Sequence, residues 1–214
     1  MNTEDLQELR QEYSGYDLDE NDVKPNPINQ FDQWMEEALN AAVPEANAMT
    51  LATTDKEGKP HARIVLLKGA DKDGFVFYTN YASDKGVELE DNPNAALCFL
   101  WSELGRQVRI EGTVEKLDEE EVNEYFQKRP YRSQIGAHAS DQSAVVESRE
   151  LLEEKFNKLI QRYSEGQVPK PNSWGGYRVL PTAIEFWQGR SSRLHDRIKY
   201  YKENNDWVIK RLCP

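Results

Sequence analysis

The segment that most constrains the fold runs from residue 48 to residue 115, where strand-like runs alternate with short loops. The predicted strands are residues 49–54, 62–68 and 75–79, and the loops between them are residues 55–58 and 71–74. Both loops begin with aspartate and end in glycine, which is typical of hairpin connections. Loops this short join antiparallel neighbours, because parallel strands need long crossovers. The segment therefore predicts an antiparallel sheet.

The rest of the chain adds further strands and several helices. Apolar alternation predicts strands at 95–101, 107–116, 177–188, 194–201 and 207–210, and apolar residues at helical spacing predict helices at 27–42, 83–90, 118–128, 131–139 and 147–163. The long 147–163 helix is expected to turn Leu151, Leu152, Phe156, Leu159 and Ile160 inward. About eight strands in hairpin-rich order favour a mainly β fold with peripheral helices, a closed antiparallel barrel, over a parallel α/β sheet.

Length and composition bound the organisation of the chain. Its 214 residues suit one domain, expected at 26–214, and the polar, acidic residues 1–25 are expected to form a mobile arm, with plain disorder as the alternative. A net charge of −11 argues against a nucleic-acid partner, because proteins that bind the phosphate backbone are usually basic. No apolar stretch approaches the roughly 20 residues that span a bilayer, and the N-terminus does not resemble a signal peptide. With only Cys98 and Cys213 as thiols, we expect a cytoplasmic protein without a membrane partner.

Several common site motifs are missing from the sequence. There is no glycine-rich dinucleotide-binding turn and no P-loop, which disfavours a Rossmann or nucleotide-hydrolase site. The histidines His61, His138 and His195 are dispersed along the chain. We therefore expect no metal site.

The segment 184–197 combines a tryptophan with basic side chains. Residues 189–192 read as a turn, and extended character resumes at residue 194, so Arg193, His195 and Arg197 are expected on one strand face with Leu194 turned toward the core. Two guanidiniums and an imidazole on one face suit a planar, anionic, nitrogen-containing ligand. A solvated basic hairpin is the alternative.

Two other patterns place cations beside possible ligands. Arg63 and Lys68 flank an apolar run and point to opposite strand faces, as a strand wedged between two anionic ligands would need. Tyr125, Arg129 and Ser133 recur every four residues, and a bend at Pro130 would let them converge on a phosphate. The alternatives are that Arg63 and Lys68 are solvated cations, and that Tyr125, Arg129 and Ser133 form a stripe on the protein surface.

These motifs together resemble those of the pyridoxine (pyridoxamine) 5'-phosphate oxidases, in the order of that family and over residues 25–214. The resemblance rests on Arg63-Ile64-Val65-Leu66-Leu67-Lys68, Tyr78-Thr79-Asn80, Gln107, Tyr125-x-x-x-Arg129-x-x-x-Ser133, Gln142-Ser143, Trp187, Arg193-Leu194-His195-x-Arg197 and Arg211-Leu212-Cys213-Pro214. It implies an antiparallel FMN-binding split β-barrel, a homodimer with FMN between subunits, and oxidation of pyridoxine or pyridoxamine 5'-phosphate to pyridoxal 5'-phosphate. Oxygen would be the acceptor and hydrogen peroxide a product.

The resemblance also implies roles for individual residues. Cofactor binding falls to Arg63, Ile64, Val65, Leu66, Leu67, Lys68, Tyr78, Thr79, Lys85, Gln107, Gln142, Ser143, Trp187 and Arg197. Substrate binding falls to Lys68, Tyr125, Arg129, Ser133, Arg193, Leu194 and His195, with Arg10 and Tyr13 at lid positions of the N-terminal arm. Arg193 and His195 are the catalytic candidates, expected to orient the substrate ring.

One position departs from the family pattern. The family usually has Arg-Lys where this chain has Asp84-Lys85, which removes a cation near the implied FMN phosphate and adds an acid. Either weaker FMN binding or compensation by Ser143 and Arg63 would follow.

Two rival functions stay open on sequence alone. A flavin reductase or other FMN oxidoreductase on the same barrel would keep Arg63, Gln107 and Trp187, but would not need Lys68, Tyr125, Arg129 and Ser133 together. A protein that binds FMN or pyridoxal phosphate without catalysis would not consume oxygen.

Overall fold

The computed structural model describes residues 2–9, 12–13, 16–204 and 206–214 and divides the chain into two compact units. Unit 1 comprises residues 1–50, 96–111 and 181–214, and unit 2 comprises residues 51–95 and 112–180.

Strands dominate the chain, as the alternating pattern predicts. They are β1 (Ala48–Thr54), β2 (Pro60–Leu66), β3 (Gly69–Asp71), β4 (Gly74–Asn80), β5 (Asn94–Trp101), β6 (Arg106–Lys116), β7 (Trp174–Gln188), β8 (Asp196–Glu203) and β9 (Asp206–Arg211). The strand order is β2-β1-β5-β6-β7-β4-β3, and β8 pairs with β7 and with β9. Strands β1, β5, β6 and β7 each run from one unit into the other.

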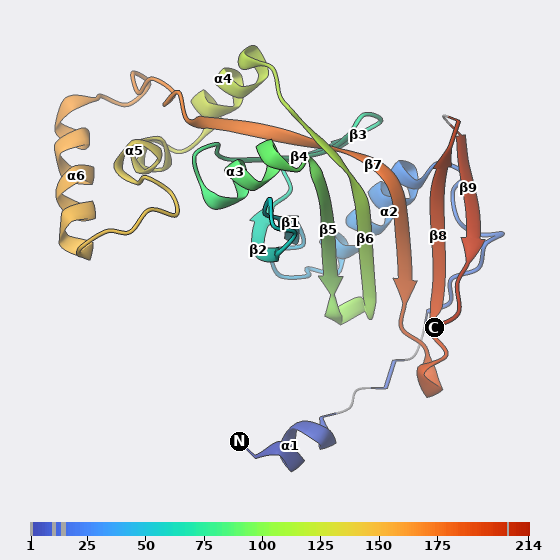
Figure 1. Ribbon diagram of the computed structural model, residues 1–214. Coiled ribbons are helices and arrows are strands. Elements are labelled where there is room, and N and C mark those ends of the chain that lie inside the picture. The colour runs from blue at the N-terminus through green and yellow to red at the C-terminus, as the bar shows by residue number, and fades with distance from the viewer. Residues whose placement is uncertain (1, 10–11, 14–15, 205) are drawn as a thin grey trace. The chain divides into compact units, whose positions relative to one another are not determined.

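Hairpins account for much of this order. In unit 2, β3 and β4 pair antiparallel around a turn in which Asp71 Oδ1 accepts hydrogen bonds from the backbone N–H groups of Asp73 (2.8 Å) and Gly74 (3.2 Å). In unit 1, β8 pairs antiparallel with both β7 and β9 (Figure 1). The short strand β3 falls where the sequence predicted no strand, because a run of three residues carries no readable alternation.

The helices differ in how they begin, and several start at a capping side chain. They are α1 (Thr3–Glu8), α2 (Pro27–Asn40), α3 (Asp84–Asp91), α4 (Glu119–Lys128), α5 (Tyr131–Ala139) and α6 (Arg149–Arg162), with 3-10 turns η1 (Ser102–Leu104) and η2 (Ser191–Arg193). The side chains of Asn26 and Asp118 accept backbone N–H groups at the starts of α2 and α4. Pro130 separates α4 from α5, so the predicted break is confirmed. Among the described residues, no helix is long and apolar enough to cross a membrane.

Each unit has an aromatic core. In unit 1, Trp34 of α2 meets Phe186 of β7 edge-on at 5.2 Å between ring centroids, and Phe186 meets Tyr200 of β8 at 5.6 Å. In unit 2, Trp174, Phe126 and Ile135 form part of a buried cluster against which α6 packs through Phe156, Leu159 and Ile160. Helices α5 and α6 lie side by side (Figure 1).

Helix α6 is less buried than its apolar pattern predicts. None of its residues is fully buried, and Leu151 is 40% exposed. The inward orientation predicted for Leu151 is therefore wrong, whereas Phe156 does pack against the core. A helix that covers a core on one side only can bury just the centre of its apolar stripe.

Helix α3 packs unusually close to the backbone that precedes it. A Cβ at Gly86 would lie 2.2 Å from the carbonyl oxygen of Tyr81, so only glycine fits there. The hydroxyl of Tyr177 donates to the carbonyl of Gly86 at 3.3 Å. These contacts fix the helix that carries Lys85 and Glu88.

The turn between β7 and β8 differs from the predicted strand start. Ser192 and Arg193 have positive φ angles of 56° and 61°, and β8 begins only at Asp196. Consecutive left-handed residues form a tight turn and interrupt strand alternation. The predictions that Arg193 and His195 share a strand face and that Leu194 points to the core are therefore wrong. Leu194 is 70% exposed.

Candidate active site

The predicted site residues fall into two groups, one on each unit. The group on unit 2 comes from β2 and the residues that follow it, from β4, α3, α4 and α5, and from the loop after α5. The group on unit 1 comes from β6, β7, β8, the turn between β7 and β8, and the segment before α2. Arg10 lies outside the residues that the structure describes.

A pocket of about 470 Å³ gathers most of the group on unit 2. It is lined by Arg63, Ile64, Val65, Leu66, Lys68, Tyr78, Thr79, Lys85, Tyr125, Arg129, Gln142 and Trp174. Of the predicted residues on this unit, Leu67 is buried at 8% exposure, and Ser133 and Ser143 line neighbouring pockets instead. The wall is apolar along β2 and cationic at its edges, which suits a flat ring that carries an anionic group.

Lys85 is held at one edge of this pocket. Its ammonium donates to Ser83 Oγ at 3.2 Å and to Gln142 Oε1 at 3.1 Å, and Thr79 Oγ1 donates to the same Gln142 oxygen at 2.9 Å. Burial, and then the nearby Arg63 charge, lower the pKa of Lys85. The cation is therefore partly desolvated, which strengthens its attraction for an anion.

Ser143 adds a strained backbone position beside Lys85. Its φ angle is 72°, a left-handed conformation that a side-chain-bearing residue adopts at a cost. Its hydroxyl accepts the backbone N–H of Asp84 at 3.3 Å. Gln142 and Ser143 thus contact Lys85 and Asp84 at the start of α3, so the predicted cofactor residues Lys85, Gln142 and Ser143 lie close together.

Arg63 has a partner that sequence reasoning missed. Its Nη2 donates to Glu88 Oε2 at 3.0 Å, and its Nη1 donates to the hydroxyl of Thr53. His61 Nδ1 lies 2.5 Å from the other oxygen of the same carboxylate. Nothing local in the sequence relates residues of β1, β2 and α3, because their proximity is a tertiary contact.

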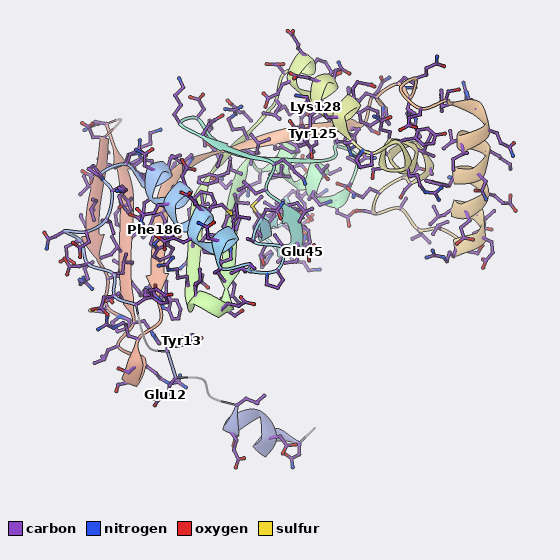
Figure 2. All side chains as sticks on the ribbon, turned by 180° about the vertical axis from the view of Figure 1, so that it is seen from behind. Glu12, Tyr13, Glu45, Tyr125, Lys128 and Phe186 are labelled. Atoms are coloured by element: carbon purple, nitrogen blue, oxygen red, sulfur yellow. The ribbon has the colours of Figure 1, made fainter. Side chains whose placement is uncertain are left out.

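An aromatic stack lies against the other edge of the pocket. Tyr78 of β4 stacks on Tyr125 of α4 with ring centroids 3.9 Å apart, and on Trp174 of β7 at 5.3 Å. Tyr125 and Lys128 both project from α4 (Figure 2). Burial raises the pKa of Tyr78 to about 12, so its phenol stays neutral and can donate a hydrogen bond. Trp174 is a lining residue that the sequence analysis did not single out.

Arg129 sits at the junction of α4 and α5 with an unsatisfied donor. Its guanidinium carbon lies 4.9 Å from the centroid of the Trp174 ring, and within the described part of the chain its buried Nη1 has no hydrogen-bond partner. Buried donors in proteins are almost always paired, so an unpaired one points to a ligand that supplies the acceptor. Arg129 lines both the 470 Å³ pocket and a neighbouring pocket of about 360 Å³ that Ser133 also lines.

The group on unit 1 centres on Trp187 and His195. Their ring centroids are 4.7 Å apart, and the Tyr13 ring meets Trp187 edge-on at 5.4 Å. A Cβ at Gly189 would lie 2.4 Å from the Tyr13 ring, so glycine gives the tyrosine its space. Figure 2 labels Tyr13.

One hydrogen bond orients His195. Its Nδ1 accepts the backbone N–H of Arg190 at 3.1 Å, so in the neutral ring the proton lies on Nε2. The imidazole can therefore donate from Nε2. Arg193 is exposed on the turn, with its side chain toward solvent.

Arg197 is held by a buried carboxylate. Its Nε donates to Glu185 Oε1 at 2.7 Å and its Nη1 to the carbonyl of Cys213 at 2.9 Å. Glu185 is 3% exposed, and its hydrogen bond is the main cause that raises the pKa of Arg197. Gln107 is half-buried on β6.

Comparison with known proteins identifies the family. Residues 35–163 match the family described as pyridoxamine 5'-phosphate oxidase, and residues 174–214 match the pyridoxine 5'-phosphate oxidase C-terminal dimerisation region. The chain belongs to the pyridoxamine 5'-phosphate oxidase family. The match to the dimerisation region supports a homodimer.

Curated relatives extend the likeness over nearly the whole chain. A protein from Burkholderia mallei (strain SAVP1), named pyridoxine/pyridoxamine 5'-phosphate oxidase, is 58% identical over 212 residues, which are 98% of this chain and 99% of that protein. A protein of the same name from Burkholderia thailandensis is also 58% identical over 212 residues, with the same coverage of both chains.

Solved structures confirm the fold class. PhzG from Burkholderia lata 383, solved in complex with tetrahydrophenazine-1-carboxylic acid, has a TM-score of 0.90 and 30% identity and covers 95% of this chain and 100% of its own. A pyridoxamine 5'-phosphate oxidase-related, FMN binding protein from Nostoc punctiforme has a TM-score of 0.70 at 16% identity, covers 90% of this chain and all of its own, and shows the fold alone. The predicted fold, a mainly antiparallel split barrel of the FMN-binding class with peripheral helices, is confirmed.

Proposed function

We propose that this chain is an FMN-dependent oxidase that converts pyridoxine or pyridoxamine 5'-phosphate to pyridoxal 5'-phosphate. Pyridoxine 5'-phosphate and O₂ give the aldehyde and H₂O₂; the amine consumes one further water and releases ammonia. The activity is the one named for the curated relatives at 58% identity.

The observation that carries this proposal is the unsatisfied Nη1 of Arg129. A guanidinium that is partly buried against Trp174 leaves its donor unpaired unless an anion enters. Arginine binds phosphate through paired, charge-assisted hydrogen bonds. Lys68 and Tyr125 line the same pocket, so a phosphorylated substrate has a cation, a guanidinium and a phenol to meet.

The residues present also fit FMN. Arg63 and Lys85 supply cations at the pocket edge, Gln142 and Thr79 supply neutral hydrogen-bonding groups, and β2 supplies an apolar wall. The Arg63–Lys85 edge of the pocket is compact, which suits one phosphate, as in FMN, rather than a pyrophosphate. When bound, FMN would supply the hydride acceptor and react with O₂.

On unit 1, we propose that side chains orient the substrate ring and supply positive charge. Trp187 offers a flat apolar surface, and His195 can donate from Nε2 to a polar substituent of the substrate ring. Arg193, exposed on the turn, adds a positive charge that orients the substrate ring. Arg197 keeps its charge because Glu185 holds it, and a fixed cation stabilises negative charge that develops nearby.

The proposed function also has a domain organisation and a cellular location. We propose a single domain over residues 26–214 preceded by an N-terminal arm, in which Tyr13 and Arg10 act as lid residues. Both Cys98 and Cys213 are free thiols, in keeping with the proposed cytoplasmic setting.

The test is steady-state turnover by the purified protein. Addition of pyridoxine or pyridoxamine 5'-phosphate should consume O₂ and form pyridoxal 5'-phosphate in equal amounts. Unphosphorylated pyridoxine should give a much lower kcat/KM, because it offers nothing to Arg129. A protein that holds FMN yet consumes no O₂ with either phosphorylated substrate would support the non-catalytic alternative.

A further inference from the structure

A second pocket of unit 2, of about 630 Å³, gathers charged side chains that the proposed function leaves largely without a role. Asp55 follows β1, His61 and Arg63 come from β2, and Asp84, Lys85 and Glu88 come from the start of α3 and its first turns. Arg63 and Lys85 also line the 470 Å³ pocket, so these two cations are shared by both pockets. A group in the second pocket that neutralises Arg63 or Lys85 therefore weakens the attraction of that cation for an anion bound in the first pocket.

Glu88 is the buried centre of this cluster. Its side chain is 8% exposed; Oε2 accepts from Arg63 at 3.0 Å and from the hydroxyl of Thr53, and Oε1 faces His61 Nδ1 at 2.5 Å. Burial alone would raise the pKa of Glu88, but the hydrogen bonds from Thr53, His61 and Arg63 outweigh burial and lower it. The carboxylate therefore stays ionised and forms an ion pair with Arg63.

The balance of charge in this pocket depends on one imidazole. With His61 neutral, the carboxylates of Asp55, Asp84 and Glu88 outnumber the two cations by one. With His61 protonated, the charges balance, and part of the negative charge of Glu88 is compensated by the imidazolium instead of by Arg63. Imidazole is the side chain whose charge ordinarily changes between about pH 5 and 8.

We propose that His61, acting through Glu88, sets how strongly Arg63 attracts the FMN phosphate, so that FMN is held more tightly when His61 is protonated. The inference rests on the proposed function, because it takes FMN as the ligand of Arg63. Glu88 and His61 are positioning residues: Glu88 contacts Arg63, His61 contacts Glu88, and both act on the phosphate through the guanidinium. Protonation of His61 is expected to strengthen FMN binding, because a protonated His61 leaves more of the Arg63 charge to attract the FMN phosphate.

The experiment measures FMN release from the holoenzyme between pH 5.5 and 8. Ultrafiltration separates free flavin, whose fluorescence gives the dissociation constant for wild type and for His61→Asn. The FMN phosphate itself is protonated as the pH falls below about 6, which weakens FMN binding by both proteins. This effect cancels in the ratio of the two dissociation constants. The affinity advantage of wild type over His61→Asn should grow about five- to tenfold from pH 8 to pH 5.5, as one added charge at close range implies. His138→Asn, on α5 and bonded to the carbonyl of Pro169, is the matched control and should show no such trend.

Two further variants test whether His61 acts on Arg63 through Glu88 or only through the long-range field of its charge. In a Glu88→Gln background, His61→Asn should change the dissociation constant less than twofold at any pH. His61→Lys, which carries a fixed charge, should hold FMN at pH 8 at least as tightly as wild type does at pH 5.5. Riboflavin, which lacks the phosphate, should bind without a His61-dependent trend.

Each contrary result has a definite meaning. A constant ratio between wild type and His61→Asn across the pH range would overturn the inference while leaving the proposed function intact. An undiminished trend in the Glu88→Gln background, or the same trend with riboflavin, would also overturn it. Wild-type protein that holds no FMN at any pH would overturn the proposed function and this inference together.

Discussion

At the scale of single residues, the unpaired Nη1 of Arg129 carries the substrate assignment, and its loss is the most direct residue test. Arg129→Ala should raise KM for phosphorylated substrate about 10- to 150-fold, because a lost charge-assisted contact costs roughly 1.5–3 kcal/mol. FMN content should stay near that of wild type. Steady-state kinetics and flavin absorbance measure the two effects.

The control for Arg129 is its neighbour Arg132. The Arg132 guanidinium lies 4.9 Å from the Phe156 ring centroid and does not line the pocket that holds Arg129. Arg132→Ala should leave KM within about twofold of wild type, since an exposed cation–π contact contributes about 0.5–1 kcal/mol to packing alone. Equal KM values for the two variants, or flavin loss from Arg129→Ala alone, would contradict the substrate-phosphate role.

His195 allows a finer residue test, because its two nitrogens have different neighbours. Asparagine can replace the Nδ1 acceptor that meets the Arg190 N–H but offers nothing at the Nε2 position, whereas glutamine places an amide N–H near Nε2. His195→Asn should therefore lower kcat/KM by about tenfold or more, and His195→Gln by less, with FMN retained in both. Asn and Gln variants with equal kcat/KM would show that the Nε2–H group has no role.

At the scale of secondary-structure elements, the close packing of α3 predicts opposite effects for two helical glycine-to-alanine changes. Gly86→Ala should destabilise the protein by about 1–3 kcal/mol, because the new methyl would meet the Tyr81 carbonyl oxygen at 2.2 Å, which outweighs a gain of roughly 1 kcal/mol in helix propensity. It should also weaken FMN binding, since α3 carries Lys85.

Gly136 on α5 is the matched control. A Cβ there would meet no atom within 4 Å, so Gly136→Ala should stabilise the protein by about 0.5–1 kcal/mol. Urea unfolding of wild type and both variants at one protein concentration measures the differences. Stabilisation by Gly86→Ala would mean that α3 is not held against Tyr81 as described.

The elements also show how far sequence reasoning reaches. Caps such as Asn26 and Asp118, the break at Pro130 and the hairpin loops were readable, because each depends on a few adjacent residues. The sequence predicts a turn after β7 but not where it ends, because Ser192 and Arg193 adopt left-handed conformations at positions without glycine. The side chain of Leu194 therefore lies outside, at 70% exposure, instead of in the core.

The same limit applies to the candidate site. The family motifs picked out most residues that line the 470 Å³ pocket, but gave no sign of Trp174 or of the Glu88–His61 pair. These arise when β1, β2, β4, β7 and α3 pack together. Only the folded chain brings such distant positions within hydrogen-bonding distance.

At the scale of the whole molecule, the match of residues 174–214 to a dimerisation region predicts assembly. Sedimentation should give a species of twice the chain's 24.8 kDa that carries one FMN per subunit. Mass spectrometry of the released flavin should show FMN and not FAD. A monomer that is fully loaded with FMN and active would contradict the homodimer.

In the proposed reaction, substrate oxidation is coupled to reduction of bound FMN, and an anaerobic titration measures this coupling. Without O₂, addition of pyridoxine 5'-phosphate to the yellow holoenzyme should abolish the absorbance of oxidised flavin and form one pyridoxal 5'-phosphate per FMN. Admission of O₂ should restore the yellow colour and release one H₂O₂ per flavin. If the flavin keeps its colour under excess pyridoxine or pyridoxamine 5'-phosphate, the chain is not the oxidase proposed here.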